Sequence, residues 1–105
     1  MNAQFKRGIL ELCIIKLISF NPKSASEILE LISMDLDVNE NTVYPILRRL
    51  KNEGVLTIEK VSSQVGAPKK MYSITENGVI HLEEQENEWR SFNEKVARIM
   101  EGRYE

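Results

Sequence analysis

The hydrophobic pattern of this chain changes its period twice, and those changes restrict the fold more than any other feature. Up to Gly54, apolar residues recur at the three- and four-residue spacing of helices. Residues 56–60 and 71–74 instead alternate apolar and polar side chains, which predicts two strands, before helical spacing returns from Glu76. A chain of 105 residues buries one core. We therefore predict one domain that is mainly α-helical and contains a small β-hairpin.

The first helix is expected over residues 4–19 and is apolar on two sides. Its apolar residues are Phe5, Ile9, Leu10, Leu12, Cys13, Ile14, Ile15, Leu17 and Ile18. Asn21-Pro22 ends it, because proline disfavours helical geometry in the residue before it. A helix that is apolar nearly all round needs cover nearly all round, and so small a domain has few elements to provide it. We expect a second subunit to supply part of that cover.

Two further helices are expected before the hairpin. Ser24 with Glu27 three residues later forms a capping box, which starts a helix whose apolar spacing continues to Leu36. The next helix follows a polar break, contains Pro45 about one turn inside it and ends at Gly54. Proline at that place forfeits one backbone donor, a cost that is tolerable near a helix N-terminus.

The last helix is expected from Glu76 to about Gly102, with Thr75 as its cap. Alternating steps of three and four residues form a heptad seam that Phe92 and Ile99 widen. The seam consists of Val79, Leu82, Glu86, Trp89, Asn93, Val96 and Met100. So long a helix has no intramolecular partner except the first helix. We therefore predict a C-terminal dimerisation helix over 76–105, forming one compact unit with residues 1–75; a lone solvated helix is the alternative.

The predicted homodimer interface is apolar. It comprises Val79, Leu82, Trp89, Phe92, Val96 and Ile99, packed with the two-sided first helix.

The net charge of −2 conceals an uneven distribution. Residues 41–75 carry six Lys and Arg against two acids, whereas residues 76–105 carry four against eight. The basic zone covers the third helix and the hairpin. This asymmetry suggests one surface for an anion and another for a different partner.

The third helix separates apolar from polar residues around its circumference. At about 100° per residue, Val43, Ile46, Leu47 and Leu50 share one face, which must be buried. The opposite face and its flanks carry donors and cations, which suit the bases and phosphates of a DNA major groove, while the hairpin lysines suit phosphates or the minor groove. The predicted DNA-binding residues are Asn41, Thr42, Tyr44, Pro45, Arg48, Arg49, Lys51, Asn52, Lys69 and Lys70. An ordinary solvated helix face is the alternative.

Catalysis finds no support in the sequence. His81 is the only histidine, and Cys13 lies in the most apolar stretch, where a thiol is normally inert. We expect no catalytic residues, no cofactor and no metal site. The absence of a membrane-length apolar run, together with a single cysteine, leads us to expect a cytoplasmic protein that does not bind membranes.

Two segments carry a family resemblance. They are Tyr44-Pro45-Ile46-Leu47-Arg48-Arg49-Leu50-Lys51-Asn52-Glu53-Gly54 and Gly66-Ala67-Pro68-Lys69-Lys70-Met71-Tyr72-Ser73-Ile74-Thr75-Glu76-Asn77-Gly78. They resemble the PadR family of transcriptional regulators, and Leu10-Glu11-Leu12-Cys13-Ile14-Ile15 resembles the first helix of that family. Ala25-Ser26 and Met71 depart from the family pattern, but both sit away from the predicted DNA-binding face.

The resemblance implies a winged helix-turn-helix fold and a homodimeric repressor that binds double-stranded DNA. Two-fold symmetry makes the expected operator pseudo-palindromic. The single C-terminal helix resembles the compact subgroup, some of whose members bind planar compounds near a tryptophan. Trp89 occupies that position, and Glu86 could balance a positive charge on an aromatic or cationic effector; plain packing of Trp89 in the dimer is the alternative. For the whole chain, the alternative function is a winged-helix protein-interaction module or antirepressor without its own operator.

Overall fold

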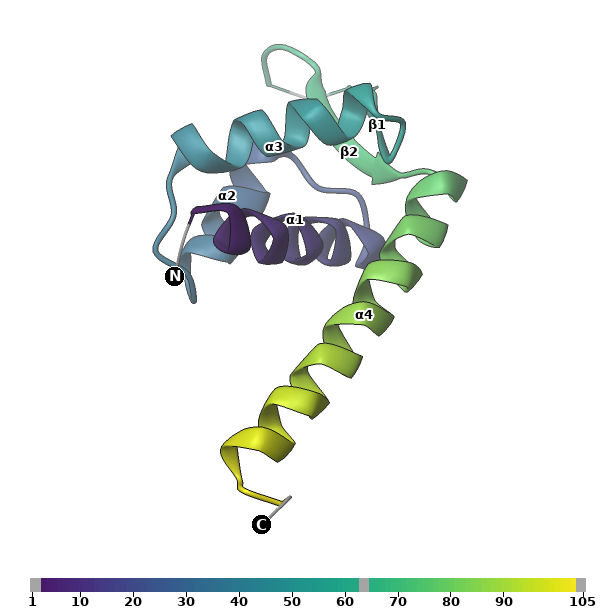
Figure 1. The fold of residues 1–105 in the computed structure, drawn as a ribbon. Coiled ribbons are helices and arrows are strands. Elements are labelled where there is room, and N and C mark those ends of the chain that lie inside the picture. Colours follow the sequence, from purple (N-terminus) through teal and green to yellow (C-terminus); the bar gives the residue numbers. More distant parts are fainter. Residues whose placement is uncertain (1–2, 63–64, 104–105) are drawn as a thin grey trace.

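The computed structural model describes residues 3–62 and 65–103, with side chains from residue 7 onward. The elements are α1 (Ala3–Phe20), α2 (Ala25–Ser33), α3 (Glu40–Asn52), β1 (Leu56–Val61), β2 (Lys69–Ile74) and α4 (Glu76–Met100). In Figure 1, the first three helices and the hairpin pack together, and α4 extends away from them. The mainly α-helical fold with a small β-hairpin is confirmed.

The polar residues around α2 and α3 fix where these helices begin and end. The capping box is present: Ser24 accepts a hydrogen bond from the backbone of Glu27, whose carboxylate accepts one from the backbone of Ser24. α2 ends at Ser33, so the prediction that the helix continues to Leu36 is wrong. Leu36 nevertheless packs against the core from the segment after the helix. Gly54 ends α3 as predicted, at a positive φ of 79°.

One apolar core lies among the three packed helices, the start of β1 and the first turns of α4. Its buried residues are Leu10, Ile14, Ile15, Ile18, Ile28, Ile32, Val43, Ile46, Leu47, Leu50, Val55, Leu56 and Leu82. On the other side of α1, Leu12, Cys13 and Leu17 are partly buried against this core. The two-sided character predicted for the first helix is therefore confirmed.

The wing consists of β1, β2 and their connection. Its strands pair antiparallel from Leu56 opposite Ile74 to Val61 opposite Lys69. A backbone bridge between Lys23 and Tyr72 ties the segment before α2 to the same hairpin. Ser63 and Gln64, which lie between the two predicted strands, are outside the described residues. The wing is thus anchored at its base to both α2 and the core.

α4 leaves the wing through a closely packed junction. Thr75 donates a hydrogen bond to the Gly54 carbonyl at 2.6 Å and accepts one from the Gly78 amide at 2.9 Å. A Cβ atom at Gly78 would lie 2.2 Å from the Val55 carbonyl oxygen, so only glycine fits without a shift. This junction sets the direction in which α4 departs, and it confirms Thr75 as the predicted cap.

Candidate nucleic-acid interface

α3 turns its polar face outward. Its four apolar residues are at most 4% exposed, which confirms the buried face predicted from helical spacing. Seven of the predicted DNA-binding residues on this helix are exposed, and Lys69 and Lys70 are exposed on β2. The seven on α3 are Asn41, Thr42, Tyr44, Pro45, Arg48, Lys51 and Asn52. The structure thus offers these side chains to solvent on one helix and the adjoining wing.

Most of the cations on this surface are uncompensated. Arg48, Lys51 and Lys70 form no ion pair within the part of the chain that the structure describes. The Nζ atom of Lys69 lies 3.8 Å from Oε1 of Glu27, and an ion pair this exposed contributes little to stability. An exposed, unpaired guanidinium can donate two parallel hydrogen bonds to guanine or to phosphate. This surface therefore suits a polyanion.

Arg49 is the exception among the predicted residues. It lies on the flank of α3 that faces α1, where it is bonded to Glu11 at 2.9 Å and to Glu53 at 3.1 Å. The hydrogen bond to Glu11 raises the pKa of Arg49, and the bond to Glu53 adds to the increase. Because two acids offset its charge, Arg49 is less available to DNA than Arg48.

Two grooves border the polar face of α3. The wing groove, about 360 Å³, lies between α3 and the wing. It is lined by Ala25, Tyr44, Leu47, Arg48, Lys51, Asn52, Ile58 and Tyr72. The α1 groove, about 550 Å³, lies between α1 and α3. It is lined by Arg7, Leu10, Asn41, Thr42, Pro45, Ile46 and Arg49.

Among the residues that line these grooves, sequence reasoning missed two that carry polar side-chain groups. Tyr72 belongs to the alternation of apolar and polar residues in β2, a pattern that predicts a strand but not a groove. In the structure its side chain is half-buried. Arg7 precedes the basic zone by more than thirty residues. Its only signal is a cationic side chain near the start of a helix that packs beside α3.

The predicted dimer residues on α4 separate into two groups. Leu82 is 6% exposed and belongs to the core of its own chain, so it offers a partner little surface. Val79, Trp89, Phe92 and Ile99 are between 38% and 64% exposed. Val96 is half-buried. Past the first turns, therefore, most of the seam has no cover within the described chain.

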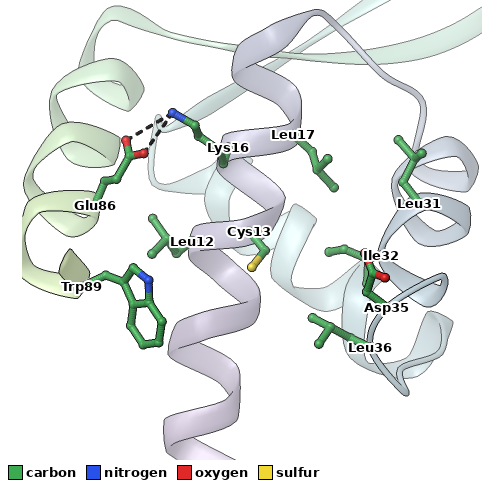
Figure 2. Close-up of a pocket in the computed structure, with 10 residues that line it drawn as sticks. All are labelled: Leu12, Cys13, Lys16, Leu17, Leu31, Ile32, Asp35, Leu36, Glu86 and Trp89. Atoms are coloured by element: carbon green, nitrogen blue, oxygen red, sulfur yellow. Dashed lines mark hydrogen bonds and ion pairs between the residues drawn. The ribbon is translucent and has the colours of Figure 1, made fainter. Parts of the chain in front are cut away.

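An apolar trough lies beside the start of that uncovered seam (Figure 2). It has a volume of about 440 Å³, with Leu12, Cys13 and Leu17 of α1 along its floor. Trp89 of α4 forms one wall, and Leu31 and Leu36 form the other. Burial raises the pKa of the Cys13 thiol, which keeps it neutral in this apolar setting.

The two carboxylates at the trough differ in their partners. Glu86 pairs with Lys16 at 3.0 Å and with Arg90 at 3.2 Å, as the dashed lines to Lys16 in Figure 2 indicate. Asp35 has no side-chain partner among the residues described. A cationic group in the trough would therefore meet an uncompensated charge at Asp35, whereas Lys16 and Arg90 already offset Glu86.

The described residues contain no cluster of potential metal ligands. None of the described helices is both long enough and apolar enough to span a membrane.

Comparisons with known proteins place this geometry among transcription factors. The model of the transcriptional regulator PadR-like family matches residues 14–84. A PadR-like transcription factor from Bacteroides fragilis is 41% identical over 92% of this chain and 95% of its own, with a TM-score of 0.79. A PadR-like transcriptional regulator from Bacillus cereus is 29% identical over 93% of this chain and 97% of its own, with a TM-score of 0.83. An uncharacterized protein of Lysinibacillus sphaericus is 30% identical over 91% of this chain and 92% of its own.

Proposed function

Because the chain belongs to the PadR-like family and is therefore a DNA-binding transcriptional regulator, we propose that it is a homodimeric repressor of a pseudo-palindromic operator. The family consists of transcription regulators and not of enzymes. The observation that carries the proposal is the outward face of α3, where Arg48 and Lys51 line the wing groove and form no ion pair among the described residues. Repression follows when such a dimer occupies DNA that the polymerase needs.

α3 is the element that enters the major groove in this proposal. Arg48 and Asn52 lie at the centre of its exposed face, where arginine can pair with guanine and asparagine with adenine. Lys69 and Lys70 extend the cationic surface onto β2, where they contact phosphates or the minor groove. Base contacts from α3 then provide specificity, and the wing contributes affinity.

A second copy of this chain is the partner that fits the trough. The trough is apolar, and the distal half of α4 carries Phe92 and Ile99 at 51% and 64% exposure without cover. Under two-fold symmetry, α4 of each copy lies along α1 of the other, so that both uncovered surfaces disappear together. This arrangement accounts for the second apolar side of α1 as well as for the seam on α4.

We propose that an effector binds where the trough meets the dimer seam at Trp89. Trp89 offers an aromatic face to a planar ring, and Asp35, rather than the paired Glu86, supplies charge for a cationic one. A ligand weakens DNA binding if it favours a spacing of the two α3 helices that differs from the spacing that DNA favours. DNA then weakens ligand binding by the same factor. Trp89 is the only tryptophan, so a planar cationic dye should quench its fluorescence and loosen the operator. Quenching with unchanged operator affinity would contradict effector control.

Selection of bound sequences from a pool of random duplexes tests the DNA-binding proposal. We expect enrichment of an inverted repeat whose half-site centres are about 34 Å apart, one turn of the double helix. Enrichment of a single half-site would contradict the dimeric operator. No enrichment would favour the alternative, a winged-helix module that contacts protein.

A further inference from the structure

The α1 groove contains an arginine outside the predicted DNA-binding set. Arg7 lies in the second turn of α1 with an exposed side chain, and it forms no ion pair within residues 7–62 and 65–103. Asn41 and Thr42, from the first turn of α3, line the same groove. The groove therefore combines a free guanidinium with amide and hydroxyl donors, the groups that contact phosphate oxygens in protein–DNA complexes.

Arg49 lines this groove too, but its charge is already used. Glu11 and Glu53 both accept hydrogen bonds from its guanidinium, at 2.9 and 3.1 Å. The Glu11 side chain is only 14% exposed, so it depends on this partner more than a solvated carboxylate would. Arg49 thus fastens α3 to α1 and leaves Arg7 as the uncompensated cation of the groove.

The two grooves lie on opposite flanks of α3. Thr42 and Arg49 line the α1 groove, whereas Tyr44 and Lys51 line the wing groove. An α-helix about 10–12 Å across nearly fills a major groove about 12 Å wide. The two phosphodiester strands that bound the major groove therefore pass along the two flanks of the inserted helix. Each flank of α3 already has a recess for one strand.

On the basis of the proposed DNA-binding function, we propose that the α1 groove receives the phosphodiester strand on the side of α3 away from the wing. Arg7 is its cationic ligand, and Arg49 is a positioning residue that holds α3 against α1. The first-turn acid Glu40 lines neither groove, so it does not oppose phosphate there. Since a backbone contact carries no base information, Arg7 strengthens binding to every duplex equally.

The salt dependence of DNA binding tests this assignment. Arg7→Gln and Arg98→Gln each remove one exposed arginine that has no ion pair among the described residues, but Arg98 lies in the last turn of α4, far along the chain from α3. Affinity for the selected operator and for a random duplex is measured between about 50 and 200 mM salt. A dimer carries two copies of Arg7, so for Arg7→Gln the slope of log affinity against log salt should become less negative by about 1.8 on both duplexes, about 0.9 for each copy. Over that range, wild type then loses about 12-fold more affinity than the variant.

Arg49→Gln provides the contrasting arm. It should lower the thermal midpoint, because Glu11 loses its partner, while its salt slope stays that of wild type. An Arg7→Gln slope equal to that of wild type and Arg98→Gln would overturn the phosphate contact even if wild type binds its operator. A slope reduced by about 1.8 in Arg49→Gln would overturn the division of roles. Failure of wild type to bind either duplex would instead overturn the proposed function, and this proposal with it.

Discussion

α3 and α4 are both amphipathic helices, but only α3 has its apolar face covered by its own chain. On α3, all four apolar residues of the stripe are buried by the same chain, at 0–4% exposure. On α4, the chain buries Leu82 and leaves Phe92 and Ile99 at 51% and 64% exposure. The comparison teaches that an apolar stripe indicates which side of a helix is covered. It does not indicate which molecule covers it.

The difference also corresponds to a division of work. Because its inner face is complete, α3 is held rigidly and can present Arg48 and Asn52 in a fixed arrangement. α4 is rigidly attached at one end, through Thr75 and Gly78, and uncovered at the other. We infer that the first region binds DNA and the second recruits the other copy. Four pairs of substitutions separate these two roles.

The largest effect is expected from Val96→Asp on α4. A carboxylate at this position would be buried without a partner in the dimer, so we expect the dimer dissociation constant to rise more than about 100-fold. Monomer helicity should change little, since Val96 is only half-buried within its own chain. Asn87→Asp adds the same charge at an exposed position of α4 and should leave the dimer intact. Equal masses for the two variants in sedimentation would contradict the interface.

Leu50→Ala on α3 should act on the chain itself. It removes a side chain that is 0% exposed, and a cavity of this kind costs about 2–5 kcal/mol of unfolding free energy. Asn52→Ala, on the exposed face of the same helix, should stay within about 0.5 kcal/mol of wild type. Urea unfolding measures both. A loss below about 1 kcal/mol for Leu50→Ala would mean that α3 is not held by the core described above.

Gly78→Ala tests the junction that connects the two regions. The added methyl meets the Val55 carbonyl oxygen at 2.2 Å, and such overpacking costs about 1–3 kcal/mol. Gly8→Ala is the matched control, because no described atom beyond its chain neighbours and its own helix backbone lies within 4 Å of the new Cβ, and alanine favours the helix. We expect thermal unfolding midpoints to move in opposite directions. A parallel shift would show that the close contact at Gly78 does not restrict substitution.

Arg48→Ala and Lys69→Ala distinguish base contacts from phosphate contacts. Loss of a base contact should weaken operator binding by about 1–3 kcal/mol and relax the preference at one base pair. Loss of the Lys69 contact should have a smaller and uniform effect on all duplexes, accompanied by a weaker salt dependence. Binding titrations on operator and random duplexes give both values. If Arg48→Ala weakened binding to the operator and to random duplexes equally, Arg48 would contact phosphate alone.

The fold was largely predictable because local signals decide it. The helix caps and turns follow from the sequence because the residues that form them act on backbone groups only a few residues away. These residues are Ser24 with Glu27, Gly54 and Thr75. The period change places the hairpin for the same reason. The end of α2 was misplaced because Leu36 continues the helical spacing and packs on the core without being helical. Spacing records burial and not backbone conformation.

The site was predictable only where it depends on one helix. The outward face of α3 follows from its own spacing. One of the two acidic partners of Arg49 is Glu11, 38 residues earlier in the chain, and no local pattern joins these two residues. Leu82 shares the heptad spacing of Trp89, yet it meets α1 of its own chain because the body of the domain still extends that far. Arg7 belongs to the interface only through the packing of α1 beside α3.

The central claim is that a second copy covers the distal half of α4, and the mass of the wild-type protein in solution tests this claim most directly. Sedimentation equilibrium at micromolar concentration should give about 24 kDa, twice the 12.1 kDa of the chain. A mass of 12.1 kDa at micromolar concentration would contradict the account, since the trough and the distal half of α4 would then have no partner.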